Sequence, residues 1–475
     1  MAFPLTRHVA LVGFMGAGKS SLGAEAAARL GRPFLDLDLE LERELGMPVA
    51  RLWEERGEAA FRELEEDLTV EALAEPAPSV LALGGGAVLS ERVRESLRDR
   101  ALTLLVEVGV EEAWARVGAS DRPLARDEEV FRRLFEARGP IYAALADARV
   151  RDADAIALAA AGVVVEPGVL AELGAHVPGD GRIALVSDPH VAGIHGADAQ
   201  LALGRRLDST HELPHGEEAK TLEAVGRLWD ALRLGRDGTL VALGGGCTTD
   251  AAGFAASAYL RGIPWVAVPT SLVGQVDAAI GGKTAIDLAA GKNLVGAFHW
   301  PVRTVIDPAL LATLPASQRL EGLAEVVKTG LLAGEPVWEL PEPELVRRCA
   351  AYKAAVCVRD PYDHGPRAVL NLGHTFAHAL EAAGGYREVT HGRAVALGLR
   401  AALGLAGLDD EPVRRLLDPK PVRVDRDRAW AALRRDKKAE NGEIRLVLLD
   451  APGRPRWGVA VPEDEVRAAL DALIA

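Results

Sequence analysis

The sequence predicts an α/β protein in which two α/β domains are followed by a mainly helical domain. Two buried strands, at 8–13 and 239–243, each run into a glycine-rich turn and then a helix, which is the order found in parallel sheets. The region after 313 is helical in pattern and carries a histidine cluster at 370–393. We therefore expect a parallel-sheet domain with helices on both sides at 1–157, a second α/β domain at 158–312 and a helical domain at 313–475.

The composition excludes several classes of function. The 475 residues carry a net charge of −14, which argues against binding to nucleic acid or to acidic membranes. The longest apolar run, 156–165, is far shorter than the ~20 residues of a membrane span. Cys247, Cys349 and Cys357 are scattered, which fits a reducing cytoplasm and predicts neither disulfides nor a cysteine metal site. We expect a cytoplasmic protein that acts on small molecules.

Lysine is rare in this chain. Only nine of the 55 basic residues are lysine. Where a lysine is present, its ammonium group provides a compact point charge that the guanidinium fork of arginine cannot replace. All of the lysines except Lys420 fall within the motifs described below. The rare lysines therefore indicate positions where an anion is bound.

A phosphate-binding loop follows the first strand. The segment GFMGAGKS, from Gly13 to Ser20, is a G-x-x-x-x-G-K-[ST] motif between a strand and a helix. Its glycines let backbone N–H groups wrap a phosphate, Lys19 reaches the β- and γ-phosphates, and Ser20 ligates Mg²⁺. The motif predicts that ATP and Mg²⁺ are bound by Gly13, Gly16, Ala17, Gly18, Lys19, Ser20 and Ser21.

Carboxylates and arginines follow this loop. Alternation puts Asp36 and Asp38 on the same side of the end of the strand expected at 34–40, where one can hold the Mg²⁺ shell and the other can orient or deprotonate an acceptor hydroxyl. The order of motifs from His8 to Val150 resembles shikimate kinase, on the phosphate loop together with Arg62, Gly84-Gly-Gly86, Asp121-Arg-Pro-Leu124 and Arg138.

The resemblance to shikimate kinase implies a role for each of these residues. Shikimate would be bound by Asp38, Arg62, Gly84, Gly85, Gly86 and Arg138, with the two arginines on its carboxylate. Lys19, Asp38 and Arg122 would be catalytic, with Arg122 on a lid that reaches the transferring phosphate. Asp36 would belong to the Mg²⁺ site. Arg116 would lie under the adenine, although its spacing is one residue short of the family pattern.

The second α/β domain has two nucleotide-binding features. Asp188 ends a strand, which is the usual place for a ribose contact. Gly244-Gly-Gly246 lies between a strand and a helix, where a backbone without side chains can approach a pyrophosphate. The string is not G-x-G-x-x-G, so by itself it leaves dinucleotide binding open.

The histidine cluster predicts a metal site. His374 and His378 are four residues apart on an expected helix and so share one face, His391 follows a Gly-Gly break, and Glu325 lies upstream. Two imidazoles and a carboxylate are the usual ligands of a catalytic zinc ion. A histidine pair with this spacing is on its own more often a surface or core feature.

The chain from about 160 to its end resembles 3-dehydroquinate synthase, on the strings GGKT, GKN, AEVVK and NLGHTFAH. The resemblance implies Glu325, His374 and His391 as ligands of Zn²⁺ or Co²⁺. It implies NAD contacts at Asp188, Glu217, Lys220, Gly245, Gly246, Cys247, Asp250, Thr270, Ser271 and Thr313.

The same resemblance implies a site for 3-deoxy-D-arabino-heptulosonate 7-phosphate. Its carboxylate and hydroxyls would be held by Asp277, Lys283, Lys353, Arg367 and Asn371. Its phosphate would be held by Asn293, Lys328, His378 and one of Lys437 and Lys438, with Lys292 in the same site. Lys283, Lys328, Lys353 and His378 would be catalytic. Arg261 would reach the partner's phosphate site, which implies a homodimer through this half.

Two departures from the family pattern and three alternatives accompany this interpretation. Asp363 and Arg393 stand where the family has glutamate. One alternative is another small-molecule kinase joined to a sugar-phosphate cyclase of secondary metabolism. A second is an iron-dependent alcohol dehydrogenase, which would have no use for phosphate-binding lysines. A non-catalytic scaffold would have lost ligands, yet no expected ligand is missing.

Overall fold

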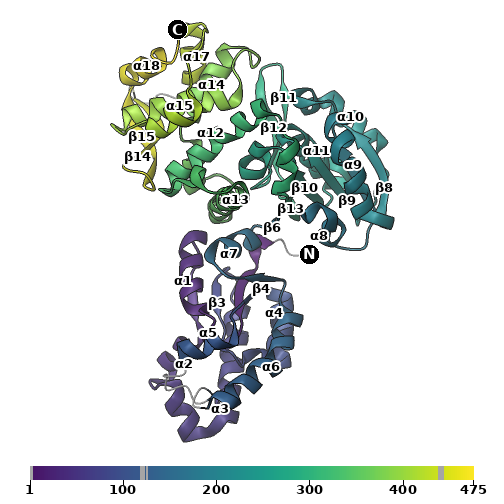
Figure 1. Cartoon of the computed structure of the whole chain (residues 1–475), viewed down its shortest axis with the longest axis vertical. Coiled ribbons are helices and arrows are strands. Elements are labelled where there is room, and N and C mark those ends of the chain that lie inside the picture. Colours follow the sequence, from purple (N-terminus) through teal and green to yellow (C-terminus); the bar gives the residue numbers. More distant parts are fainter. Residues whose placement is uncertain (1–3, 118–123, 125–126, 437–442) are drawn as a thin grey trace. The chain divides into compact units, whose positions relative to one another are not determined.

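The computed structural model describes residues 4–117, 124, 127–436 and 443–475. The chain forms two compact units, Met1–Ala161 and Gly162–Ala475, which are described separately (Figure 1). The expected boundary at 157 falls inside helix α7 (Ala153–Ala160), whose residues Ile156 and Ala157 are fully buried in unit 1. Arg122, Lys437 and Lys438, which the sequence analysis assigned to the two sites, lie outside the described residues.

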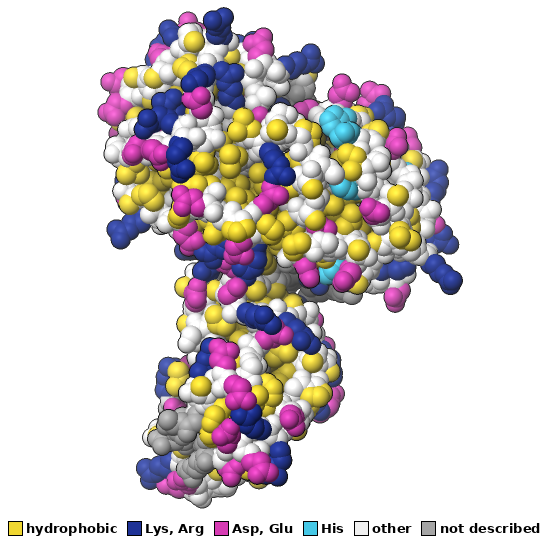
Figure 2. Space-filling model, in the orientation of Figure 1, with side chains coloured by type: hydrophobic (Ala, Val, Ile, Leu, Met, Phe, Trp, Pro, Cys, Tyr) yellow, Lys and Arg dark blue, Asp and Glu magenta, His cyan; other side chains and the backbone are white. Residues whose placement is uncertain are grey.

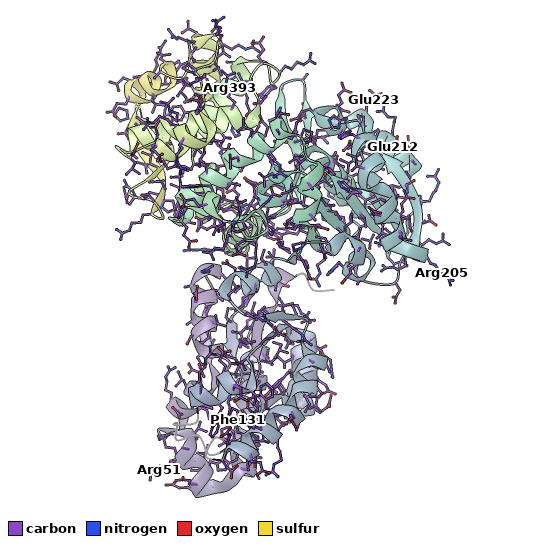
Figure 3. All side chains as sticks on the ribbon, viewed as in Figure 1. Arg51, Phe131, Arg205, Glu212, Glu223 and Arg393 are labelled. Carbon is purple, nitrogen blue, oxygen red and sulfur yellow. The ribbon has the colours of Figure 1, made fainter. Side chains whose placement is uncertain are left out.

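Unit 1 is built on a parallel sheet, as the sequence predicts. The strand order is β2-β3-β1-β4-β5, and every pair in it is parallel. The strands are β1 (His8–Val12), β2 (Phe34–Asp36), β3 (Val80–Ala82), β4 (Ala101–Val106) and β5 (Ala148–Val150). The helices are α1 (Lys19–Leu30), α2 (Leu37–Leu45), α3 (Val49–Ala74), α4 (Glu91–Arg100), α5 (Val110–Val117), α6 (Glu128–Leu145) and α7. Phe131, labelled in Figure 3, is fully buried in the core of this unit. The central strand β1 leads directly into the phosphate loop.

Unit 2 begins with a six-stranded parallel sheet. Its order is β6-β13-β10-β9-β7-β8. The strands are β6 (Val163–Val165), β7 (Ile183–Ser187), β8 (Leu207–Glu212), β9 (Thr239–Gly244), β10 (Trp265–Pro269) and β13 (Arg303–Ile306). The helices include α8 (Leu173–His176), α9 (Pro189–Leu203), α10 (Leu222–Ala231) and α11 (Gly246–Ala258), and an antiparallel hairpin joins β11 (Lys283–Leu288) to β12 (Gly291–Phe298). Strands β7, β9 and β10 are buried along their whole length, which explains their continuous apolar sequences.

The rest of unit 2 is mainly helical, again as predicted. The helices are α12 (Ala316–Ala333), α13 (Glu342–Arg359), α14 (His374–Ala383), α15 (His391–Leu405), α16 (Glu411–Leu417), α17 (Arg426–Asp436) and α18 (Glu463–Asp471). A hairpin of β14 (Glu443–Leu449) and β15 (Pro455–Pro462) completes this part. Helix α14 packs against α15 and α17 around a shared apolar core, and Figure 1 shows these helices grouped beside the hairpin.

The distribution of surface charge and the length of the helices are two further features of the structure. On the face shown in Figure 2, basic and acidic side chains are interspersed rather than gathered by sign. No helix among the described residues has the length and apolar character needed to span a bilayer.

The strand expected at 34–40 is shorter than predicted. Strand β2 ends at Asp36, and helix α2 begins at Leu37. The Asp36 carboxylate caps this helix, since it accepts hydrogen bonds from the backbone N–H groups of Asp38 and Leu39 at 3.2 and 3.4 Å. Asp36 and Asp38 therefore do not lie on the same side of one strand, because Asp36 ends the strand and Asp38 lies in the first turn of α2.

Candidate active sites

The phosphate loop of unit 1 is arranged around an open helix N-terminus. Gly13, Gly16 and Gly18 have φ values of 146°, 81° and 89°, and Gly18 immediately precedes α1. The Lys19 ammonium group donates to the backbone oxygens of Gly13 and Phe14 at 2.9 and 3.1 Å, so its side chain folds back along the loop. A loop of this shape presents several N–H groups and one cation to a phosphate chain.

Arg116 lies against the same loop. Its Nη1 donates to the backbone oxygen of Gly16 at 2.9 Å, and its Nη2 contacts Glu112 at 2.5 Å. The one-residue difference in spacing therefore does not remove Arg116 from the nucleotide site. The side chain reaches the loop from α5.

A second cluster of unit 1 brings together most of the residues expected to bind the acceptor. A Cβ atom on Gly84 would lie 2.8 Å from Oδ1 of Asp38, and one on Gly86 would lie 1.9 Å from Nη1 of Arg62. Arg138 is 5% exposed and donates to the backbone oxygen of Gly85 at 3.3 Å. Only glycine permits these polar groups to approach the backbone so closely. The triple glycine is thus the floor of a small polar site.

This polar site adjoins the phosphate loop. A Cβ atom on Gly85 would lie 3.6 Å from the backbone nitrogen of Met15 and 3.8 Å from the oxygen of Gly13. The triple glycine and the phosphate loop are therefore direct neighbours within unit 1. That is the geometry that phosphoryl transfer needs.

Glu65 belongs to the same cluster, and the sequence analysis missed it. Its side chain is 5% exposed and forms an ion pair with Arg62. Burial raises the pKa of Glu65, and the nearby Arg62 guanidinium opposes this shift. The only sequence signal is its position three residues after Arg62 in a glutamate-rich helix, which does not distinguish it from its exposed neighbours.

Three side chains of unit 2 form a candidate metal centre. Glu325 on α12, His374 on α14 and His391 on α15 each offer one ligand atom, and these atoms lie within 4.8 Å of one another. Nε2 of His391 is 3.0 Å and Nε2 of His374 is 3.5 Å from Oε1 of Glu325. Both histidines begin their helices, so the packing of α14 against α15 and of α12 against α15 assembles the group.

The chemistry of these donors fits a divalent cation. Two imidazole nitrogens and a carboxylate oxygen are the donor set of a catalytic zinc site with a free coordination position. Glu325 is 1% exposed, and Lys328 forms an ion pair with its Oε2. Burial opposes ionisation, yet Lys328 and the two histidines hold the pKa of Glu325 well below its usual range. A buried carboxylate with a lowered pKa suits the anionic ligand position of such a cation.

The rare lysines gather around this centre. Lys328 donates to Oδ2 of Asp277 at 3.0 Å, and Lys353 pairs with Oδ1 of the same carboxylate. Lys328 is 2% exposed. The two ammonium groups therefore flank Asp277, beside the metal ligand Glu325. This concentration of charge suits a substrate with several anionic groups.

A second ionic group lies at the hairpin of β11 and β12. Lys220 donates to Asp250 at 2.8 Å and pairs with the side-chain oxygen of Asn293, while Lys292 donates to Glu217 at 2.6 Å. Although burial opposes it, Asp250 raises the pKa of Lys220 above its usual value. The backbone of Asn293 has φ 58°, a left-handed conformation that asparagine tolerates.

A pocket of about 440 Å³ opens beside this ionic group. It is lined by Glu217, Glu218, Asp287, Leu288, Ala289, Gly291, Lys292, Gly385, Tyr386 and Arg387. Lys292 also lies over the Tyr386 ring, 5.5 Å from its centre. The lining of the pocket thus comes from the α/β part with its hairpin and from the loop between α14 and α15 that precedes His391.

Residues expected to contact a dinucleotide lie at the carboxyl ends of the strands. Gly245 and Gly246 begin α11 after β9, and a Cβ atom on Gly245 would lie 3.5 Å from Oγ of Ser271. Nε2 of His195 lies 2.9 Å from Oγ1 of Thr313. Asp188 is buried and caps α9 through the backbone N–H groups of His190 and Val191. One carboxylate oxygen of Asp188 is therefore committed to the fold.

Arg367 is a buried cation close to the GGKT turn. It is 2% exposed, and its Nη2 donates to the backbone oxygen of Gly281 at 2.9 Å. A Cβ atom on Gly281 would lie 2.6 Å from that Nη2, so the glycine permits the contact. Within the described part of the chain, Nε of Arg367 has no hydrogen-bond acceptor. An unpaired buried donor of this kind is suited to a ligand carboxylate.

The two departures from the family pattern have separate partners. Asp363, with φ 60°, forms an ion pair with Lys283. Arg393, labelled in Figure 3, lies on α15 and donates to the backbone oxygens of Lys420 and Pro421 at 3.0 and 3.1 Å. Neither contact involves Glu325, His374 or His391.

The fold and the two sites define an enzyme that joins a P-loop kinase to a metal-centred α/β enzyme of the dinucleotide-binding type. The chain is similar to the bifunctional shikimate kinase/3-dehydroquinate synthase of Thermotoga maritima, at 33% identity over 94% of this chain and 96% of the relative. The chain belongs to this bifunctional shikimate kinase/3-dehydroquinate synthase family. Family models agree, with shikimate kinase matching 15–166 and the N- and C-terminal domains of 3-dehydroquinate synthase matching 210–321 and 322–439.

Further comparisons concern unit 2. The chain is 42% identical to the 3-dehydroquinate synthase of Bordetella pertussis over 65% of this chain and 94% of the relative. A 2-deoxy-scyllo-inosose synthase solved with carbaglucose-6-phosphate, NAD⁺ and Co²⁺ has a TM-score of 0.59 and 26% identity, and covers 65% of this chain and 96% of its own. A 2-epi-5-epi-valiolone synthase from Streptomyces hygroscopicus, with NAD⁺ and Zn²⁺ bound, has a TM-score of 0.57 and 30% identity, covering 66% and 96%.

Proposed function

We propose that unit 1 transfers the terminal phosphate of ATP to shikimate. The phosphate loop holds the nucleotide, Lys19 neutralises the transferring group, and Ser20 and Asp36 serve the Mg²⁺ site. Arg62 and Arg138 hold the shikimate carboxylate over the triple glycine, while Asp38 orients the acceptor hydroxyl and takes its proton. The closeness of this polar floor to the loop supports the assignment. Arg122 would reach the transferring phosphate.

We propose that unit 2 converts 3-deoxy-D-arabino-heptulosonate 7-phosphate to 3-dehydroquinate and phosphate. Glu325, His374 and His391 would hold Zn²⁺ or Co²⁺, and NAD would lie across the carboxyl ends of the strands. When bound, the metal would acidify a ring hydroxyl, and NAD would accept hydride from the carbon that bears this hydroxyl and later return it. The oxidised ring would lose a proton and then phosphate, the returned hydride would restore the hydroxyl, and the ring would open and reclose by aldol addition.

The protein's own residues would stabilise the anionic groups of this substrate. Lys328, His378, Asn293 and Lys292 would hold the leaving phosphate, together with one of Lys437 and Lys438. Lys283, Lys353, Arg367, Asn371 and Asp277 would hold the carboxylate and the hydroxyls. A leaving group with two negative charges requires several cations at once, which accounts for the gathering of lysines.

The observation that favours a substrate with a carboxylate is the buried Nε of Arg367, which has no hydrogen-bond acceptor among the described residues. A second candidate function is cyclisation of a sugar phosphate without a carboxylate, and it is favoured by the likeness to an enzyme solved with carbaglucose-6-phosphate. Such a substrate would offer Arg367 no anion. The proposed substrate does, so the buried guanidinium favours 3-dehydroquinate formation.

Two assays on the purified chain test these proposals. One measures ATP-dependent phosphorylation of shikimate, and the other measures phosphate release from 3-deoxy-D-arabino-heptulosonate 7-phosphate or from glucose 6-phosphate. We expect activity with shikimate and with the heptulosonate. Phosphate release from glucose 6-phosphate but not from the heptulosonate would show that the proposed cyclase substrate is wrong.

A variant of a metal ligand tests the metal centre. His374→Ala removes one of three donors, so the chain should lose bound metal and phosphate release together, while shikimate phosphorylation is unchanged. Metal content by elemental analysis is the direct measurement. Normal metal content in this variant would place the centre elsewhere.

We further propose that unit 2 forms a homodimer in which Arg261 contributes to the partner's phosphate site. Leu260 and Arg261 have φ values of 50° and 69° and lie in an exposed turn. Such a backbone is strained for non-glycine residues and points to a constraint beyond local folding. Sedimentation of the chain and of Arg261→Ala, with phosphate-release kinetics, tests this assignment.

A further inference from the structure

We infer that Glu381 is a positioning residue of the metal centre, which holds the His391 ring in the tautomer and orientation that bind the metal. The inference rests on the proposed cyclase function and extends it to a residue outside the three ligands. Glu381 lies in the last turn of α14 and is 5% exposed. The sequence analysis gave Glu381 no role, either from its neighbouring residues or from the resemblance of the chain to 3-dehydroquinate synthase.

The geometry places the His391 ring between two buried carboxylates. Nε2 of His391 is 3.0 Å from Oε1 of Glu325, and Nδ1 is 3.5 Å from Oε1 of Glu381. Nδ1 points away from the other two ligands, so only Nε2 can bind a metal shared with Glu325 and His374. A carboxylate at Nδ1 keeps the proton on that nitrogen and leaves the lone pair of Nε2 free.

The two histidine ligands are supported in different ways. Nδ1 of His374 lies 3.2 Å from the backbone oxygen of Leu372, an interaction within its own segment. His391 instead depends on a carboxylate from another helix. It is the first residue of α15, and its side chain is 37% exposed, compared with 12% for His374. His391 therefore has less support from packing and depends more on Glu381.

A second carboxylate fixes the backbone at the same place. Oε2 of Glu321 accepts a hydrogen bond of 2.5 Å from the backbone nitrogen of Gly392. Glu321 lies on α12, one turn before Glu325, so a single helix supplies a ligand and anchors the segment that carries another ligand. With the backbone fixed by Glu321, the remaining freedom of His391 is the rotation of its ring, which Glu381 restrains.

The consequence is measurable as metal affinity. Removing a carboxylate that orients a ligating histidine costs about 10–100-fold in metal affinity. Glu381→Gln preserves the size of the side chain and removes its charge. Glu388→Gln is the matched control, because Glu388 is an exposed glutamate in the loop just before His391 and has no role in either site.

The test titrates the metal-free full-length chain with Co²⁺ against a competing chelator and records the visible absorption of bound Co²⁺. We expect Glu381→Gln to raise the Kd for Co²⁺ by about 10–100-fold and to change the absorption spectrum. Urea unfolding of the metal-free chain should be unchanged, and Glu388→Gln should behave as the wild type.

Three results would overturn the inference. Glu381→Gln with wild-type affinity and spectrum would show that the carboxylate does not position His391. A metal-free Glu381→Gln chain that unfolds at lower urea would show a structural role instead. If the wild type and Glu388→Gln themselves bind no Co²⁺, the proposed metal centre is wrong and the inference on Glu381 falls with it. This result differs from the first two, in which the wild type binds Co²⁺ and only the inference on Glu381 is wrong.

Discussion

We expect Lys19 to serve only the kinase, since it lies in the phosphate loop of unit 1 and donates to the backbone oxygens of Gly13 and Phe14. Lys19→Ala removes the cation that neutralises the transferring phosphate. Loss of one such preorganised charge costs about 10²–10³-fold in rate. We expect shikimate phosphorylation to fall by at least this factor while phosphate release by unit 2 is unchanged. An equal fall in both activities would contradict two independent sites.

Gly86 is required because Arg62 occupies the space of its missing side chain. Gly86→Ala should displace the guanidinium and raise KM for shikimate by about tenfold or more, since a lost charged hydrogen bond costs roughly 1.5–3 kcal/mol. KM for ATP should be unchanged. Gly109→Ala is the control, because a Cβ atom there would meet nothing within 4 Å. An unchanged KM for shikimate in Gly86→Ala would remove Arg62 from the acceptor site.

At the residue scale the sequence predicted groups whose signal is local or rare. The phosphate loop has a fixed spacing, and two of the three metal ligands are histidines, of which the chain has only 11. Glu65 could not be predicted because it is one glutamate among many in α3, and Glu381 could not be predicted because nothing in the sequence of α14 indicates that it lies beside His391. What distinguishes them is burial against a charged partner, and that arises only when separate helices pack together.

At the scale of elements, His8 ties strand β1 to the segment between α3 and β3. Its ring is buried, with Nε2 2.9 Å from the backbone oxygen of Glu75, while the N–H of Ser79 donates to Nδ1 at 3.2 Å. Burial lowers the pKa of His8. The hydrogen bond to the Glu75 carbonyl opposes this shift, whereas the charges of Arg32 and Arg100 add to it. The native element therefore holds a neutral imidazole.

The sign of the pH dependence follows from this shift. Because the pKa of His8 is lower in the folded state, the unfolded chain binds more protons below about pH 6.5, and stability is lost as the pH falls from there. We expect protection of the β1 amides against hydrogen exchange, corrected for intrinsic rates, to decrease between about pH 7 and 5. In His8→Asn, which retains an acceptor for Ser79, the protection of the β1 amides should decrease less over this pH range. An equal decrease in both chains would exclude His8 as the cause.

Element types were predictable where burial patterns were continuous, and boundaries were not. Strands β7, β9 and β10 read as unbroken apolar runs because both faces are covered. The end of β2 was misplaced because an aspartate that fits a strand also caps a helix, and Asp36 does the latter. Capping depends on backbone geometry that alternating residues do not reveal.

At the scale of the whole molecule, the two proposed activities would act on different intermediates. The proposed product of unit 2 is 3-dehydroquinate, whereas unit 1 would consume shikimate, and a dehydration and a reduction separate them. Direct transfer of product between the sites is therefore chemically impossible. Joining the two units ensures equal amounts of both enzymes.

Separating the units tests this independence. The compact units divide between Ala161 and Gly162, so a cut placed there keeps α7 with unit 1, where Arg29 pairs with Asp154. We expect each piece to retain its turnover within about twofold, because additive behaviour is usual for sites that share no partner. Steady-state kinetics on the two pieces measures this. A large fall in phosphate release, with fold and metal retained, would show coupling between the sites.

Strand β6 has a consequence for the order in which the protein is made. Unit 1 consists only of the first 161 residues, so it can fold while the ribosome is still translating the rest. Strand β6 (163–165) follows at once, yet its partner β13 (303–306) is synthesised much later. At about 5–20 residues per second, the β6 segment waits on the order of ten seconds with its backbone unpaired. During that interval, the nascent chain presents an apolar Val-Val-Val strand that a chaperone could bind.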